Sequence, residues 1–182
     1  PLELGADISL LSLTKYSNCH SDALGGVVCC NDERWGDKMV FAQKALGLQP
    51  SPFDCWLIQR GLKTQAIRVE RHSQNAKIMA EYLEERLSEA KILYPFLESH
   101  PQYEIAKKQM LLGSGIISVD LGLDFETTKS FLNELKLFTK AESLGGIESL
   151  VCHPASMTHA SVPKDVRESV GITDSLFRYS TV

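Results

Sequence analysis

Short apolar runs alternate with amphipathic, charge-bearing segments along most of the chain, and this alternation limits the fold more than any other feature. Residues 125–135 and 164–169, for example, have helical spacing, whereas residues 115–121 alternate apolar and polar side chains as strands do. Strands interspersed with helices are typical of layered α/β or α+β domains. The sequence therefore predicts an α/β fold. Its expected strands cover residues 8–13, 27–30, 91–94, 115–121, 137–139, 150–152 and 176–180.

Capping residues mark where the first helices begin and end. Asn31 or Asp32 can cap a helix that runs to about Leu46, and Gly47 is a typical stop. Ser51 can cap a second helix that has Pro52 in its first turn. We expect helical structure over residues 53–87 with a break at Gly61. The division into domains is predicted near this break, with one domain over residues 1–65 and a second over residues 66–182.

Composition excludes several classes of function. The 182 residues are 43% hydrophobic and 23% charged, which is ordinary for a globular protein and unlike a disordered one. A net charge of −4 disfavours binding to nucleic acids or anionic membranes. The five cysteines include no C-x-x-C pair, and the Cys and His spacings match no common zinc module, so we expect no metal. Free thiols in a reducing cytoplasm are the simplest interpretation.

Two hydroxyl residues and a lysine follow the first apolar run. If that strand is buried, desolvation favours the neutral, nucleophilic form of the Lys15 amine. Ser12 and Thr14, two residues apart on a strand, would point to one face and could bind a phosphate. This combination suits a Schiff-base lysine beside a phosphate site, as pyridoxal phosphate requires. Spacing alone, however, favours an ordinary solvated lysine in a loop.

Arginine 178 lies in the last apolar run, between Phe177 and Tyr179. Its neighbours should point to the opposite face of the strand, so the guanidinium needs an anion, and a carboxylate fits its planar fork. A structural ion pair is the alternative. Glu142 and Ser143 place an acid and a hydroxyl before Gly145 and Gly146, where a plain turn is the alternative.

Four longer motifs carry a family resemblance. They are SLTKYSNCHSDALGG at residues 12–26, PSPFDCWL with RGLKT at residues 50–64, LFTKAESLGGIESL at residues 137–150 and PASMTHASVP at residues 154–163. In this order they resemble the C-terminal half of the cystathionine γ-lyase/γ-synthase family of pyridoxal-phosphate enzymes. The resemblance implies an aspartate-aminotransferase-like fold (fold type I). Residues 1–65 would end the large cofactor domain, and residues 66–182 would form the smaller C-terminal domain, truncated before its last helix.

The resemblance also implies residue roles. Lys15 would carry the cofactor and move protons on the substrate, and Ser12 and Thr14 would hold the cofactor phosphate. The substrate carboxylate would bind Ser143 and Arg178, with Thr158 nearby and Glu142 shaping the distal pocket. The implied reaction is γ-elimination of cystathionine to cysteine, 2-oxobutanoate and ammonia in a cytoplasmic homotetramer. A γ-synthase or a methionine γ-lyase type of activity is the alternative.

The chain also departs from the family pattern. Cys19 stands where the family usually has glycine, so Cys19 is strained if that position needs a positive φ. The N-terminal half that would hold the cofactor ring is not in this sequence. We therefore expect the 182 residues alone to be inactive or nearly so. The remaining alternative is a non-catalytic family member that serves as an assembly or interaction piece.

Overall fold

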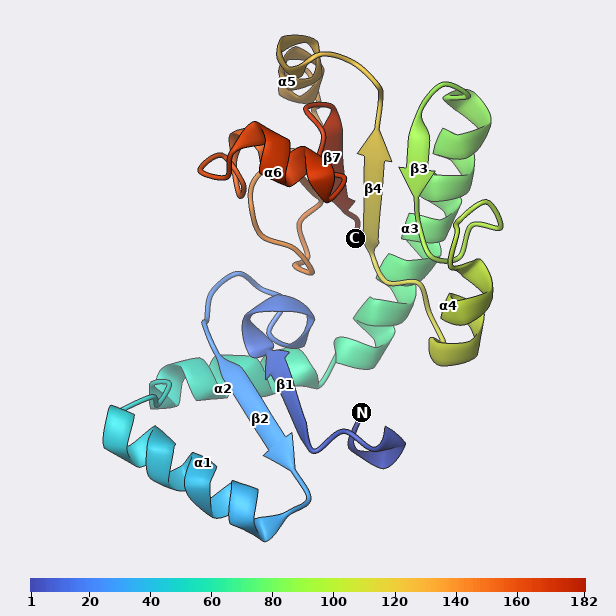
Figure 1. The fold of residues 1–182 in the computed structure, drawn as a ribbon. Helices are drawn as coiled ribbons and strands as arrows, with labels where there is room; N and C mark the ends of the chain where they lie inside the picture. The colour runs from blue at the N-terminus through green and yellow to red at the C-terminus, as the bar shows by residue number, and fades with distance from the viewer. The chain divides into compact units, whose positions relative to one another are not determined.

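The computed structural model describes residues 1–182 and contains two compact units, Pro1–Gln65 and Ala66–Val182. Figure 1 traces the elements of both units from the N-terminus to the C-terminus. The first unit carries the segment around Lys15, and the second carries Glu142, Ser143, Thr158 and Arg178.

The first unit is built around a two-stranded antiparallel sheet. Strand β1 (Ile8–Ser12) pairs with β2 (Gly26–Cys30), and Ser12 lies opposite Gly26. A short 3-10 turn (Leu2–Leu4) precedes β1, and a π-helical turn, η2 (Leu13–Ser17), follows it. Helices α1 (Glu33–Leu46) and α2 (Pro52–Leu62) complete the unit.

The predicted helix caps are confirmed in this unit. The Asp32 carboxylate accepts a hydrogen bond from the amide of Arg34 at 2.9 Å, and α1 ends at Gly47 with φ +67°. The Ser51 hydroxyl accepts from the amide of Asp54 at 3.0 Å, with Pro52 at the first position of α2. Local sequence therefore sets both helix starts.

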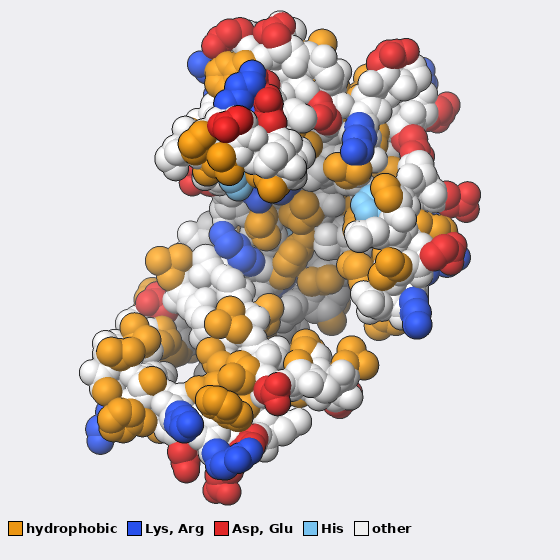
Figure 2. Space-filling model, in the orientation of Figure 1, with side chains coloured by type: hydrophobic (Ala, Val, Ile, Leu, Met, Phe, Trp, Pro, Cys, Tyr) orange, Lys and Arg blue, Asp and Glu red, His pale blue; other side chains and the backbone are white.

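The condition that the first strand is buried is not met. Leu10 and Leu11 in β1 are 77% and 49% exposed, because β1 belongs to a sheet of only two strands. Phe41 in α1 is 72% exposed, and Val28 in β2 is also exposed. Figure 2 shows hydrophobic side chains gathered over the part of the molecule that β2 and α1 occupy. Few large apolar side chains are buried in the first unit, where Ile58 is one of them.

The helix break lies slightly beyond the predicted position. Helix α2 continues through Gly61 to Leu62, and α3 (Gln65–Arg86) begins after a turn at Lys63 and Thr64. Gly61 is buried inside α2. It is therefore not a helix breaker, and its lack of a side chain has another cause, a close backbone contact that is described below.

The second unit contains a five-stranded sheet in the order β3-β4-β7-β6-β5. All neighbouring strands are antiparallel except the parallel pair β5 and β6. The predicted strand at residues 137–139 begins later, because the amide of Thr139 makes the first link, to the carbonyl of Ser149. The strands are β3 (Lys91–Leu93), β4 (Ile116–Asp120), β5 (Thr139–Lys140), β6 (Leu150–Cys152) and β7 (Leu176–Ser180).

Helices surround this sheet, and the hydrophobic core lies in the same unit. Besides α3, they are α4 (Tyr103–Gln109), α5 (Phe125–Asn133), the 3-10 turn η3 (Pro154–Ser156) and α6 (Lys164–Ser169). Central strands alternate as the sequence predicts, with Ile117 and Val119 of β4 packing beside Phe177 and Tyr179 of β7. Ala76 and Ala80 bring α3 to this core. No helix has the length and apolar character needed to cross a membrane.

Candidate functional site

The lysine of the first unit sits on a turn that begins where β1 ends. The amides of Leu13 and Thr14 both donate to the carbonyl of Gly25, at 2.9 and 3.3 Å. The Thr14 hydroxyl accepts from the Gly25 amide at 3.0 Å and reaches the Gly25 carbonyl at 3.3 Å. Thr14 thus fastens the turn to the segment that leads into β2.

The strand-based argument for Ser12 and Thr14 is wrong. Only Ser12 belongs to β1, whereas Thr14 lies in the π-helical turn, so strand alternation does not relate their side chains. Ser12 is exposed, and its hydroxyl makes no hydrogen bond within the chain. Ser12 is therefore available to a ligand, while Thr14 is partly committed to Gly25.

Lys15 is half-buried and has a non-helical backbone, with φ −88° and ψ −125°. Its carbonyl accepts a hydrogen bond from the amide of Cys19 at 2.8 Å. Cys19 itself has φ +73° and is 1% exposed. The conditional expectation for Cys19 is thus met: a buried L-residue occupies the left-handed region that favours glycine, at a cost of about 1–2 kcal/mol.

The chemistry of this donor set suits pyridoxal phosphate. An amine can condense with the cofactor carbaldehyde, and hydroxyl groups are donors to a phosphate. Ser12, Thr14 and Lys15 place these groups within four consecutive residues. The residues present therefore fit this cofactor.

In the second unit, Arg178 of β7 reaches the loop that contains Glu142 and Ser143. Its Nη2 atom donates to the carbonyls of Glu142 and Ser143, at 2.7 and 2.9 Å. Its Nε atom is buried and has no partner, and the side chain makes no ion pair. The structural ion pair considered from the sequence is thus absent. A buried unpaired donor costs about 1–3 kcal/mol, and no carboxylate of this chain neutralises the guanidinium charge, so an anion would supply the missing counter-charge.

The loop itself is anchored beside β7. Gly145 is buried, has φ +72° and donates through its amide to the Ser180 hydroxyl at 2.9 Å. Ser143 is half-buried, and the Glu142 side chain is exposed. Arg178 and Ser180 therefore fix the position of the loop from the same strand.

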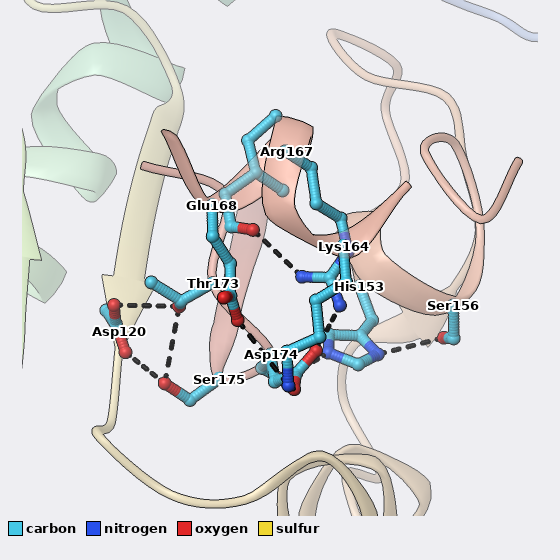
Figure 3. Close-up of polar contacts among 10 residues, drawn as sticks. Asp120, His153, Ser156, Lys164, Arg167, Glu168, Thr173, Asp174 and Ser175 are labelled. Carbon is cyan, nitrogen blue, oxygen red and sulfur yellow. Dashed lines mark hydrogen bonds and ion pairs between the residues drawn. The ribbon is translucent and has the colours of Figure 1, made fainter. Parts of the chain in front are cut away.

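The loop after β6 contains Thr158 and rests on a histidine. His153 is buried, with Nδ1 2.8 Å from the Ser156 hydroxyl and Nε2 2.9 Å from the Asp174 carbonyl (Figure 3). Because a carbonyl only accepts, Nε2 donates to Asp174 and Nδ1 accepts from Ser156. Thr158 is exposed, and its hydroxyl lies 2.8 Å from Nδ1 of His159.

The network continues through charged residues around Asp174. The Asp174 carboxylate contacts Lys164 and Arg167, and these hydrogen bonds lower its pKa (Figure 3). The sequence pattern around His153 does not predict this network. No group of three or more His, Cys, Asp or Glu side chains could hold a metal ion. The pattern His-Pro-Ala-Ser gives no local sign of the partner at Asp174.

Comparisons with known proteins agree with the site chemistry. The sequence profile of the Cys/Met metabolism PLP-dependent enzyme family matches residues 1–181. The chain is 50% identical to a cystathionine beta-lyase of Coxiella burnetii over 99% of its length, and this covers 47% of that relative. It is also 50% identical to the cystathionine gamma-lyase of Macaca fascicularis, again over 99% of its length and over 44% of the relative.

Solved structures extend the likeness to the fold. The crystal structure of cystathionine gamma-lyase from yeast matches the whole chain with a TM-score of 0.94 at 44% identity, over 47% of that structure. A cystathionine gamma synthase from Xanthomonas oryzae pv. oryzae, in complex with aminoacrylate and cysteine, matches with a TM-score of 0.93 at 41% identity, over 47% of its length. The fold class predicted from the sequence is thus confirmed. The chain spans about half the length of the relatives it matches, and it belongs to the Cys/Met metabolism PLP-dependent enzymes, the family whose cofactor is pyridoxal phosphate.

Proposed function

We propose that this chain forms part of a carbon–sulfur lyase that converts cystathionine and water into cysteine, 2-oxobutanoate and ammonia. The observation that carries the proposal is the half-buried guanidinium of Arg178, which has no ion pair and whose buried Nε donor has no partner. A substrate carboxylate would supply the counter-charge that this guanidinium lacks within the chain. The proposal assigns the activity to an enzyme in which the other half of the relatives' length is also present.

Lys15 is the proposed attachment point for the cofactor and the general base. Bound pyridoxal phosphate supplies an electron-accepting ring that stabilises negative charge on the substrate. The Lys15 Nζ atom then accepts the proton from the substrate Cα and moves protons between its carbons. The backbone that carries this amine is held by the hydrogen bond from the Cys19 amide to the Lys15 carbonyl.

The other residues hold and orient the ligands. Ser12 and Thr14 bind the phosphate, in agreement with the uncommitted hydroxyl of Ser12. Arg178 and Ser143 bind the substrate carboxylate, which fixes the bond to be broken relative to the cofactor ring. Thr158 lies near this carboxylate in the proposal, and Glu142 shapes the distal end of the pocket.

One comparison supports a second reaction, β-elimination of cystathionine, as well as it supports γ-elimination. The relative from Coxiella burnetii is a cystathionine beta-lyase, at the same identity as the gamma-lyase from Macaca fascicularis. Loss of the sulfur from the β-carbon would instead give homocysteine, pyruvate and ammonia. Gamma-synthase and methionine γ-lyase activities remain alternatives of the same chemical class.

Product analysis of the complete enzyme tests the proposal. With cystathionine as substrate, we expect cysteine and 2-oxobutanoate to form in equal amounts, and K15A to abolish their formation. Homocysteine and pyruvate would instead identify the β-lyase. Addition of cysteine and an activated homoserine ester tests for synthase activity. Turnover that survives K15A would refute the assignment of Lys15, and no turnover with any of these substrates would favour the non-catalytic assembly piece.

Assembly and location are part of the same proposal. We propose a cytoplasmic homotetramer, and the five cysteines without disulfides suit a reducing compartment. Analytical ultracentrifugation of the complete enzyme tests the tetramer. A monomer at micromolar concentration would contradict it.

A further inference from the structure

Helix α2 lies unusually close to the backbone that follows Lys15. A Cβ atom placed on Gly61 would lie 2.3 Å from the carbonyl oxygen of Asn18 and 2.7 Å from that of Ser17. Both are main-chain atoms, which cannot rotate away as the end of a flexible side chain can. Only glycine therefore lets α2 pack against this turn.

The same backbone atoms belong to the turn that holds the lysine. The amide of Asn18 donates to the carbonyl of Leu13 at 2.8 Å, and the amide of Cys19 donates to the carbonyl of Lys15 at 2.8 Å. The carbonyl oxygen that meets Gly61 and the amide that holds Lys15 belong to one rigid peptide, between Asn18 and Cys19. A displacement of that peptide by α2 therefore moves the Lys15 carbonyl as well.

The turn has little freedom to yield. The side-chain amide of Asn18 donates from Nδ2 to the Asp22 carboxylate at 2.9 Å, and Nδ1 of His20 lies 2.7 Å from the main-chain carbonyl oxygen of Asn18. Asn18 and Cys19 are both buried, and Cys19 is already in the left-handed region. A steric push from α2 is consequently transmitted through the turn instead of being absorbed.

We infer that Gly61 is a positioning residue for Lys15, acting through the peptide between Asn18 and Cys19. The inference rests on the proposed role of Lys15 as the cofactor lysine. It goes beyond that role because it assigns a function to a residue in a different element, α2, that packs against the backbone of this turn.

Gly36 supplies a matched control in the same unit. It also lies inside a helix, α1, but the nearest atom to a Cβ placed there is the Cys30 sulfur at 3.9 Å, an ordinary contact. Both G36A and G61A should favour helix formation through backbone propensity. A difference between them therefore reports the contact with Asn18.

The test measures Lys15 directly in the complete enzyme, prepared without its cofactor. Wild type, G36A and G61A are each incubated with pyridoxal phosphate and quenched with borohydride at several times, and the reduced adduct is located by peptide mass mapping. Hydrogen exchange of the Cys19 amide is measured without cofactor. For G61A we expect Lys15 labelling to slow at least tenfold and Cys19 exchange to accelerate, with labelling of the other lysines and the G36A control unchanged.

Each outcome has a definite meaning. Equal Lys15 labelling and equal Cys19 exchange in G61A and G36A would overturn the inference about Gly61. Absence of Lys15 labelling in wild type would overturn the proposed role of Lys15, while exchange at Cys19 would still show whether Gly61 fixes the turn.

A double variant covers the case in which G61A unfolds the first unit. A glycine at position 19 has no Cβ, so the peptide between residues 18 and 19 can turn away from α2 without left-handed strain. We therefore expect C19G to restore folding to G61A, while Lys15 labelling stays slow because the rotated peptide no longer holds the Lys15 carbonyl. Failure of C19G to rescue a G61A chain that has unfolded would contradict the proposed route through this peptide.

Discussion

Arg178 donates from one nitrogen, Nη2, to the carbonyls of both Glu142 and Ser143, at 2.7 and 2.9 Å. The guanidinium therefore fixes the loop with one nitrogen, while its charge has no carboxylate partner within the chain and its buried Nε donor makes no hydrogen bond. This division of donors is specific to arginine, because the ammonium of lysine offers one compact charge without a rigid fork.

We accordingly predict that R178K raises the KM of the complete enzyme for its amino-acid substrate about 10- to 100-fold, as loss of a charged hydrogen bond worth roughly 1.5–3 kcal/mol requires. Steady-state kinetics measure this effect. R167K is the control, because Arg167 is buried but bound to Asp174. R167K should lower stability without changing KM, and an unchanged KM in R178K would contradict the carboxylate role.

At position 19 we predict that glycine gives a more stable protein than alanine, although alanine is usually the more stabilising of the two. Both C19A and C19G remove the buried sulfur, but only C19A keeps a Cβ at φ +73°. Left-handed strain of about 1–2 kcal/mol, less a gain of about 0.4–1 kcal/mol from the stiffer unfolded chain, makes C19G the more stable by roughly 0.5–1 kcal/mol. Denaturant unfolding of both variants measures the difference. Greater stability of C19A would show that the turn is unstrained.

Burial and the nearby charge of Arg68 lower the pKa of His72 in α3. The unfolded chain therefore binds this proton first, at a pH of about 6.5, and stability falls as the pH drops below that value. The carboxylates of Asp120 and Asp174 also stabilise the folded protein, but this contribution is lost only at lower pH, because their pKa values lie below the ordinary carboxylate range. Denaturant midpoints at pH 7.5 and 5.5 should differ in wild type and much less in H72N. An equal change in midpoint between the two pH values in wild type and H72N would exclude His72 as the cause.

The His153 network should control the mobility of the loop that contains Thr158. H153F preserves a ring but leaves the Ser156 hydroxyl and the Asp174 carbonyl without their partners. A penalty of about 1–3 kcal/mol corresponds to roughly 10- to 100-fold faster local opening. Hydrogen exchange of the Met157 and His159 amides, both bonded to the Pro154 carbonyl, measures it. H153Q, which keeps a donor and an acceptor, should restore part of the protection; identical exchange in H153F and wild type would contradict the network.

Much of the local structure could be predicted because its causes are local. The cap at Asp32, the stop at Gly47 and the cap at Ser51 each depend on a few neighbouring residues. Strands β6 and β7 were predicted with their observed bounds, since buried central strands have clear apolar patterns. Arg178 was correctly separated from Phe177 and Tyr179 by strand alternation.

The errors concern contacts between distant segments. The apolar pattern of β1 indicates a strand but not what covers it, and Leu10 is exposed. Gly61 looked like a helix break because nothing nearby in the sequence reveals the Asn18 carbonyl against which it packs. Likewise, the partner of His153 is a main-chain carbonyl at Asp174, and every residue type has such a carbonyl.

The central claim is that the Lys15 amine carries pyridoxal phosphate. The most direct measurement is borohydride reduction of the complete enzyme with bound cofactor, followed by peptide mass mapping of the reduced adduct. We predict a single stoichiometric label on Lys15, which disappears in K15A. A label on any other lysine, or no label in an enzyme that still releases a keto acid, would contradict the account.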